Sequence, residues 1–226
     1  MHGERVLRFT MPTLLFLDTS AATATICLSV SGSVAAIRRH ENAMEQAAVI
    51  NTLIAEVIAG ASITLKEIDA VVVCAGPGSY TGLRVGMSAA KGLCFALDKP
   101  LLLFNRLELI ALGFVDNTNV YTVLKARLGE YFMASYNSEM KVMDEPAHYF
   151  VYALSEKLRV DNMVVTDDNS ELQIANAIEI PKDYSVNIDK WIWVAEKRFT
   201  QQKFDDLAYS EPFYLKAAYT TTQSKK

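Results

Sequence analysis

The sequence predicts an α/β protein made of two mixed lobes. Short apolar runs typical of strands precede stretches of helical periodicity, and this order recurs in both halves of the chain. The length of 226 residues, with 51% hydrophobic and 21% charged residues, is enough to bury a large core. We expect a leader at residues 1–12, lobes at 13–104 and 105–218, and a polar tail at 219–226.

The first lobe is predicted to begin with antiparallel strands. Thr13–Leu17 is an extended apolar run, and Thr23–Val30 follows it with several β-branched residues. A Ser-Gly turn then leads to a third strand over Val34–Arg38. Three short strands in succession are typical of one side of a mixed sheet.

A change of hydrophobic period predicts the first long helix, over Ala43–Ile58. Its polar face is narrow, so the helix has more apolar surface than one sheet needs to cover. We therefore expect it to contact a second helix or a partner chain as well. The apolar stripe consists of Ala43, Ala47, Ile50, Ile54 and Val57.

The middle of the first lobe is predicted as strand, glycine-rich loop, helix and strand. Asp69–Ala75 is a continuous apolar run, as in a strand covered on both faces. It enters the loop Gly76–Gly82, which precedes a helix over Leu83–Leu97. Small residues in that helix allow another backbone to approach closely, and a last strand follows at Leu101–Phe104.

The second lobe is predicted to repeat the pattern more loosely. A hairpin with glycine in its turn is expected after a first helix. The predicted elements are a helix at Leu107–Phe114, strands at Val120–Ala126 and Tyr131–Tyr136, a helix at Tyr152–Leu158, a strand at Asn162–Thr166 and a helix at Asp189–Phe204.

Charge and cysteine content limit the function classes. Twenty-two Lys and Arg against 26 Asp and Glu give a net charge of −4, which argues against unaided nucleic-acid binding but leaves a local basic patch open. Cys27, Cys74 and Cys94 lie among apolar neighbours with no CxxC pair, as expected for reduced core thiols. No apolar run is long enough for a membrane span, so we expect a cytoplasmic protein without a membrane partner.

Two loops at predicted strand ends are candidates for binding a phosphate. A glycine-rich turn at the head of a helix presents unpaired N–H groups, and a strand-end carboxylate could hold a phosphate-bound cation. The alternative is that the glycines serve only the geometry of a tight turn. The candidate residues are Asp18, Thr19, Ser20, Gly76, Gly78, Ser79, Thr81 and Gly82. We expect Gly82→Val to impair such a site without unfolding the core.

The sequence contains no recognisable metal or nucleophile motif. His2, His40 and His148 are too far apart for paired ligands, and we expect the last two to lie in loops. The acidic pairs Asp167–Asp168 and Asp205–Asp206 are predicted to be solvated loop charges. No catalytic residues and no metal ligands are therefore assigned.

Several motifs resemble the TsaB family, also called YeaZ. Leu15–Ser20 (LFLDTS), Leu65–Ala70 (LKEIDA) and above all Gly76–Gly86 (GPGSYTGLRVG) match its start and its glycine loop. Lys125–Tyr131 is similar to its hairpin, and Glu211–Lys216 to its closing element. The resemblance is strong over residues 13–97 and thinner beyond them.

The resemblance implies an actin-like fold, as in Hsp70 and sugar kinases, with two ribonuclease-H-like lobes. It implies a noncatalytic subunit in the synthesis of N6-threonylcarbamoyladenosine in tRNA. Such a subunit forms a homodimer alone and a heterodimer with the metal-containing transferase TsaD. The other components that the resemblance implies are TsaE, an ATPase, and TsaC, which supplies the activated group. The tRNA is an indirect partner. No tightly bound cofactor is implied, although ADP or ATP could bind at the partner interface. The older superfamily label is M22 glycoprotease. Candidate interface residues are Ala47, Ile50, Ile54, Ala89 and Leu93.

The chain departs from the family pattern at two places. Lys125 stands where the family usually has Asp, and Asn42 and Gln46–Ala48 stand where the family often has a His and a Leu-Leu-Pro run. The absence of histidine from Asn42–Ile50, where TsaD-type proteins hold a metal through a His-x-x-x-His pair, fits the noncatalytic role that the resemblance implies. A different class of function remains as the alternative. It is a stand-alone actin-like nucleotide hydrolase or small-molecule kinase that uses Asp18 and the loop Gly76–Gly82.

Overall fold

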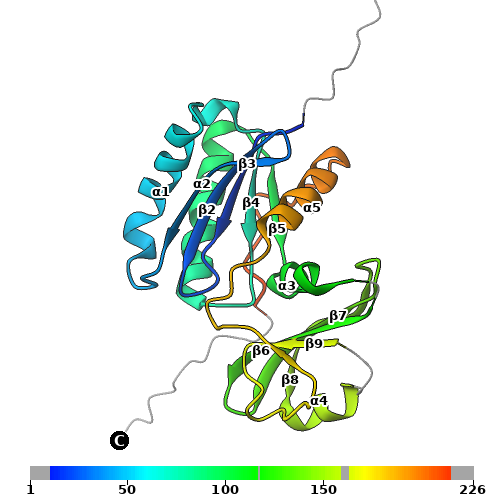
Figure 1. Cartoon of the computed structure of the whole chain (residues 1–226). Helices are drawn as coiled ribbons and strands as arrows, with labels where there is room; N and C mark the ends of the chain where they lie inside the picture. Colours follow the sequence, from blue (N-terminus) through cyan, green and yellow to red (C-terminus); the bar gives the residue numbers. More distant parts are fainter. Residues whose placement is uncertain (1–10, 117, 159–162, 215–226) are drawn as a thin grey trace, which may run out of the picture.

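The computed structural model describes residues 11–116, 118–158 and 163–214 and shows two sheets, one above the other in Figure 1. His2, most of the predicted leader and the predicted tail at 219–226 lie outside the described residues. Among the described residues, no helix is both long and apolar enough to cross a bilayer.

The first sheet has five strands in the order β3-β2-β1-β4-β5. β1 pairs with β2, and β2 with β3, in antiparallel fashion, whereas β1, β4 and β5 are mutually parallel. Parallel neighbours require crossover connections, which the helices after β3 and β4 supply. The strands are β1 (Leu14–Asp18), β2 (Ala24–Val30), β3 (Ser33–His40), β4 (Ala70–Cys74) and β5 (Leu101–Phe104).

Helices cover both faces of this sheet, which explains its continuous apolar strands. Along β1, Leu15 and Leu17 join the core under α1 (Gln46–Gly60) and α2 (Tyr80–Leu97). Leu14 and Phe16 point to the other face, which is covered by α3 (Arg106–Phe114) and α5 (Ile188–Thr200). The short helix η1 (Leu65–Glu67) precedes β4.

The second sheet repeats the strand order of the first. β8-β7-β6-β9-β10 has two antiparallel pairings followed by two parallel ones. This duplication confirms the predicted α/β class of two mixed lobes. Its elements are β6 (Val120–Arg127), β7 (Glu130–Tyr136), β8 (Val142–Phe150), α4 (Val151–Lys157), β9 (Met163–Thr166) and β10 (Ile178–Glu179).

Some elements differ from the sequence prediction. β8 was not predicted, because Pro146 and a charged, partly exposed pattern hid an edge strand; His148 therefore lies in a strand rather than a loop. His40 likewise ends β3. α2 begins at Tyr80, three residues earlier than predicted, because the side chain of Ser79 accepts a hydrogen bond from the Gly82 N–H.

The C-terminal part of the described chain returns to the first sheet. α5 contacts β3 and β5, although it follows the second sheet in sequence (Figure 1). Asp205 accepts a hydrogen bond from the Leu103 N–H, and the Phe213 N–H donates to the Ala75 carbonyl. Asp205 thus holds the loop after α5 against β5 through this hydrogen bond and is not a solvated loop charge.

Candidate functional site

The glycine loop packs directly on the turn that ends β1. The Ser79 N–H donates to the Ser20 carbonyl at 2.8 Å, and the Thr19 hydroxyl donates to the Gly82 carbonyl at 2.7 Å. Ligand loops of α/β sheets meet in this way at the carboxyl ends of neighbouring strands. Both predicted loops therefore lie at one place in the fold.

Close packing between these loops explains two of the glycines. A Cβ at Gly78 would lie 2.2 Å from the Ser20 carbonyl oxygen, and one at Gly82 would lie 2.0 Å from that of Thr19. Gly76 differs, because its φ of +110° favours glycine by itself. A side chain at Gly82 would therefore strike the chain's own backbone, which argues against the expectation that Gly82→Val leaves the stability of the fold unchanged.

The carboxylate of Asp18 is used within its own turn. Its Oδ1 accepts hydrogen bonds from the Ser20 N–H at 2.9 Å and from the Ser20 hydroxyl at 2.6 Å. The thiol of Cys74 lies 3.4 Å from that hydroxyl, and burial raises the pKa of this thiol well above its usual range. All three cysteines are buried and free, as predicted.

A cleft of about 370 Å³ lies between the two lobes beside the glycine loop. Of the eight candidate phosphate-site residues, Ser20, Gly78 and Ser79 line it. Thr81 instead lines a groove on the far side of the loop, and Asp18 lies buried behind the turn. The structure thus gathers only part of the predicted site around one cavity.

Side chains that the sequence analysis did not assign to this site give the cleft its charge. Arg106, Lys125 and Lys182 line it, and Arg106 is only 6% exposed. The Nε of Arg106 has no hydrogen-bond partner among the described residues. A buried guanidinium with a free donor is an arrangement that favours an anion.

Lys125 is held by acidic neighbours. Its ammonium lies 3.1 Å from Asp168 and 2.6 Å from Glu171, and these bonds raise its pKa. The pKa of Asp168 is lowered to about 2, mainly by the hydrogen bond from the Ser170 hydroxyl and to a smaller extent by the Lys125 ammonium. Asp167 accepts from the Lys125 N–H at 2.7 Å, and burial raises its pKa. The pair Asp167–Asp168 is therefore structural, contrary to the solvated role predicted.

Chemically, the cleft is suited to binding an anion. Of the three cations in its lining, Lys125 is already paired with Asp168 and Glu171, so Arg106 and Lys182 are left to meet an anion, beside the half-buried carboxylate of Asp167. Within residues 11–116, 118–158 and 163–214, no three His, Cys, Asp or Glu side chains come together as metal ligands.

A second concave surface lies between α1 and α2. This groove of about 700 Å³ is lined mainly by small and apolar side chains. At one end, the Arg84 guanidinium lies 4.0 Å from the ring centroid of Tyr80 and donates to the Tyr214 hydroxyl. The lining residues are Ala47, Ile50, Asn51, Tyr80, Thr81, Arg84, Val85, Ser88, Ala89, Gly92 and Leu93.

The groove contains four of the five predicted interface residues. Ala47, Ala89 and Leu93 are at least partly exposed there. Ile50 is only 4% exposed at its floor, and Ile54 is part of the core under the helix rather than of the groove. The prediction for Ile54 is therefore wrong, because that side of the stripe faces the chain's own sheet.

Comparison with known sequences links the chain to tRNA modification proteins. The family model described as TsaD, tRNA N6-adenosine threonylcarbamoyltransferase, matches residues 29–223. The chain is 27% identical to the tRNA threonylcarbamoyladenosine biosynthesis protein TsaB of Haemophilus influenzae over 213 residues, 90% of this chain and 83% of that protein. It is 52% identical over 60 residues to a tRNA N6-adenosine threonylcarbamoyltransferase of Bartonella bacilliformis, covering 26% of this chain and 16% of that enzyme.

Solved structures share the fold over nearly the whole chain. YeaZ from Pseudomonas aeruginosa superposes with a TM-score of 0.75 at 20% identity, covering 90% of this chain and all of that one. A second Pseudomonas aeruginosa structure, described as similar to peptidase YEAZ, gives 0.78 at 20% identity and covers 91% of this chain and all of that one. Together with the sequence matches, this confirms the resemblance drawn from the glycine loop.

Proposed function

The chain belongs to the TsaD family, and from this membership we propose that it is a noncatalytic subunit of the cytoplasmic machinery that makes N6-threonylcarbamoyladenosine in tRNA. In this role it binds and stabilises the transferase of the same family. Its own homodimer would use the same surface and would compete with that complex.

The near full-length similarity to TsaB carries the proposal. The chain covers 83% of that relative but only 16% and 21% of transferases from Bartonella bacilliformis and Clostridium perfringens, so it spans about a fifth of such enzymes or less. The segment Asn42–Ile50, where TsaD-type proteins carry their His pair, contains no histidine. This supports a role beside the transferase rather than in its place.

The groove between α1 and α2 is the surface best suited to the partner. The side chains of Ala47, Ala89 and Gly92 in this groove are small or absent, so a partner helix could approach the backbones of α1 and α2 closely. Leu93 and Val85 supply apolar area, and Arg84 beside Tyr80 offers a polar rim. Such a centre and rim are typical of protein interfaces.

Two experiments test the proposal. The chain should co-purify with the TsaD of its own organism as a stable complex. Leaving the chain out of a reconstituted reaction with TsaC, TsaD, TsaE and tRNA should abolish or strongly reduce modification. Full modification without the chain would contradict the proposal.

A second function, nucleotide binding in the interlobe cleft, is favoured by the buried Arg106. Its free Nε and the neighbouring Lys182 could contact the phosphates of ADP or ATP, in the isolated chain or at the partner interface, whereas Lys125 is already paired with Asp168 and Glu171. Calorimetric titration with ADP tests this. Arg106→Met should weaken binding far more than Lys182→Met at the rim. A kinase or hydrolase would in addition turn ATP over without partners.

A further inference from the structure

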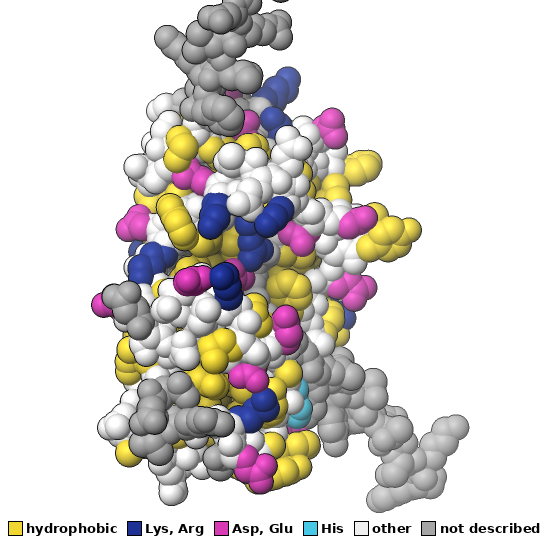
Figure 2. Space-filling model, turned by 90° about the vertical axis from the view of Figure 1, so that its right-hand side faces the viewer, with side chains coloured by type: hydrophobic (Ala, Val, Ile, Leu, Met, Phe, Trp, Pro, Cys, Tyr) yellow, Lys and Arg dark blue, Asp and Glu magenta, His cyan; other side chains and the backbone are white. Residues whose placement is uncertain are grey.

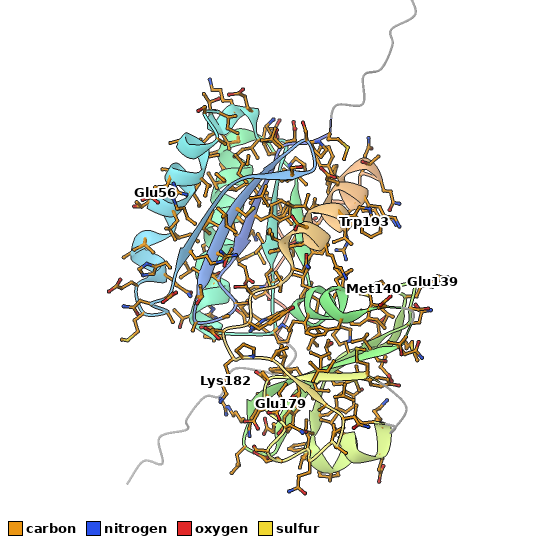
Figure 3. The ribbon with its side chains drawn as sticks, in the orientation of Figure 1. Glu56, Glu139, Met140, Glu179, Lys182 and Trp193 are labelled. Atoms are coloured by element: carbon orange, nitrogen blue, oxygen red, sulfur yellow. The ribbon has the colours of Figure 1, made fainter. Side chains whose placement is uncertain are left out.

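One further groove, away from both surfaces above, combines positive charge with an exposed aromatic ring. It has a volume of about 610 Å³ and lies between α5, α3 and the turn that joins β7 to β8. Figure 2 shows Lys and Arg side chains gathered on this side of the molecule, and Figure 3 shows Trp193 on α5 and Met140 on the turn. We call Lys190, Trp193, Lys197 and Lys203 the α5 patch.

The two tryptophans of α5 have opposite environments. Trp191 is 1% exposed and packs edge-on against Phe16, whereas Trp193 is 61% exposed. Trp193 is thus dispensable for the core. The Lys197 ammonium lies 5.5 Å from its ring centroid, so a cation and a flat ring are presented together.

The lysines of the patch are free to meet a ligand. None of the three forms an ion pair with a carboxylate of the described residues. The two acidic residues of the groove are already matched, Glu108 by Arg198 and Glu139 by Lys141. The groove is therefore locally positive on a chain whose net charge is −4.

The spacing of these side chains fits an extended polyanion. Lys190 and Lys197 are seven residues apart on one helix, about 10 Å along its axis. That length matches roughly three phosphates of a stacked strand. Trp193 lies between them in sequence and on the same lining surface.

We propose that the α5 patch binds a single-stranded segment of RNA, with a base stacked on Trp193 and phosphates on Lys190, Lys197 and Lys203. Exposed aromatic rings beside cations are the means by which proteins hold unpaired nucleotides. An acidic protein segment would use the lysines but would have no use for a stacking ring. The identification of the RNA as tRNA rests on the proposed function. The inference that the patch binds RNA rests only on its charge and its exposed ring.

The test uses the full chain and fluorescently labelled tRNA, with affinity measured by anisotropy at several salt concentrations. Lys197→Glu should weaken binding about tenfold or more and reduce the salt slope by about one. Trp193→Ala should weaken it about fivefold or more, and Trp193→Phe should restore most of the loss. Lys66→Glu, the same charge change on η1, should alter affinity less than twofold. In the unmodified chain, tRNA should quench the fluorescence of the exposed indole.

Three outcomes would overturn the inference. Equal weakening by Lys197→Glu and Lys66→Glu would show only nonspecific attraction. Unchanged affinity in Trp193→Ala, with displacement of tRNA by polyglutamate, would indicate a surface for acidic protein segments. Lack of tRNA binding by the chain, both alone and with TsaD, would also reject it. If TsaD still binds and tRNA modification still needs the chain, the proposed function survives that failure.

Discussion

At the scale of single residues, the glycine loop shows what the printed sequence can and cannot reveal. The glycine-rich run from Gly76 to Gly82 can be recognised as a loop from the sequence alone, because glycine allows backbone conformations that other residues rarely adopt. What approaches Gly78 and Gly82 is invisible in sequence, because the neighbouring atoms belong to a turn about 60 residues earlier. The carbonyls of Thr19 and Ser20 occupy the space that a side chain at Gly82 or Gly78 would need.

The close approach at Gly82 gives a stability prediction. Gly82→Ala should cost about 2 kcal/mol or more through overpacking, lowering Tm by several degrees. Gly92→Ala is the matched control in the same helix, because a Cβ there meets nothing within 4 Å. It should instead stabilise by about 0.5–1 kcal/mol through helix propensity. Thermal unfolding measures the Tm of both variants. Equal Tm values would contradict the explanation that the Thr19 carbonyl leaves no room for a side chain at Gly82.

The carboxylates beside Lys125 should respond to pH in opposite ways. The pKa of Asp168 is lowered to about 2, so its stabilisation is present above about pH 4 and lost as pH falls toward 2. The pKa of Asp167 is raised by burial, so its ionised form opposes folding at neutral pH.

Asp168→Asn should therefore lower Tm at pH 7, by an amount of order 1 kcal/mol, and have little effect near pH 2. Asp167→Asn should keep or raise Tm at pH 7, with any gain disappearing below about pH 4. Tm curves from pH 2 to 8 distinguish the two. The same sign for both substitutions at pH 7 would show that these pKa directions do not govern stability.

At the scale of elements, apolar periodicity located the strands of the first sheet and its helices to within a few residues. It failed at β8, an edge strand whose mixed exposure gives no clean alternation. It also could not place α5, because a helix pattern does not say which sheet the helix covers. The structure shows that α5 covers the first sheet, where Arg198 donates hydrogen bonds to the Leu103 carbonyl and to Glu108 of α3.

Arg198 should therefore be critical for the docking of α5. Arg198→Met removes these charge-assisted hydrogen bonds and the contact of the guanidinium with Phe104, and should cost about 2–3 kcal/mol. Lys190→Met, on the same helix without an ion pair among the described residues, is the control and should change stability by less than about 0.5 kcal/mol. Urea unfolding of both variants measures the difference. A loss below 1 kcal/mol for Arg198→Met would mean that apolar packing alone holds the helix.

At the scale of the whole molecule, two lobes of the same strand order enclose one cleft and leave a separate groove on the outer helices. From the excess apolar width of the first helix and the small residues of the second, the sequence predicted a partner-binding surface on these helices, but not that the surface is a groove. It could not show that Ile54 faces inward, since both sides of a two-sided helix are apolar. The buried Arg106 was equally hidden, because an arginine after a helix cap is usually solvated.

The affinity of the chain for its own TsaD, measured by calorimetry, tests the central claim most directly. Ala47→Arg places an unpaired charge in the groove and should weaken the complex about 100-fold or more, with the Tm of the isolated chain unchanged. Ala59→Arg, an exposed position of α1 outside the groove, should bind like the unmodified chain. Full affinity in a folded Ala47→Arg variant would contradict the account.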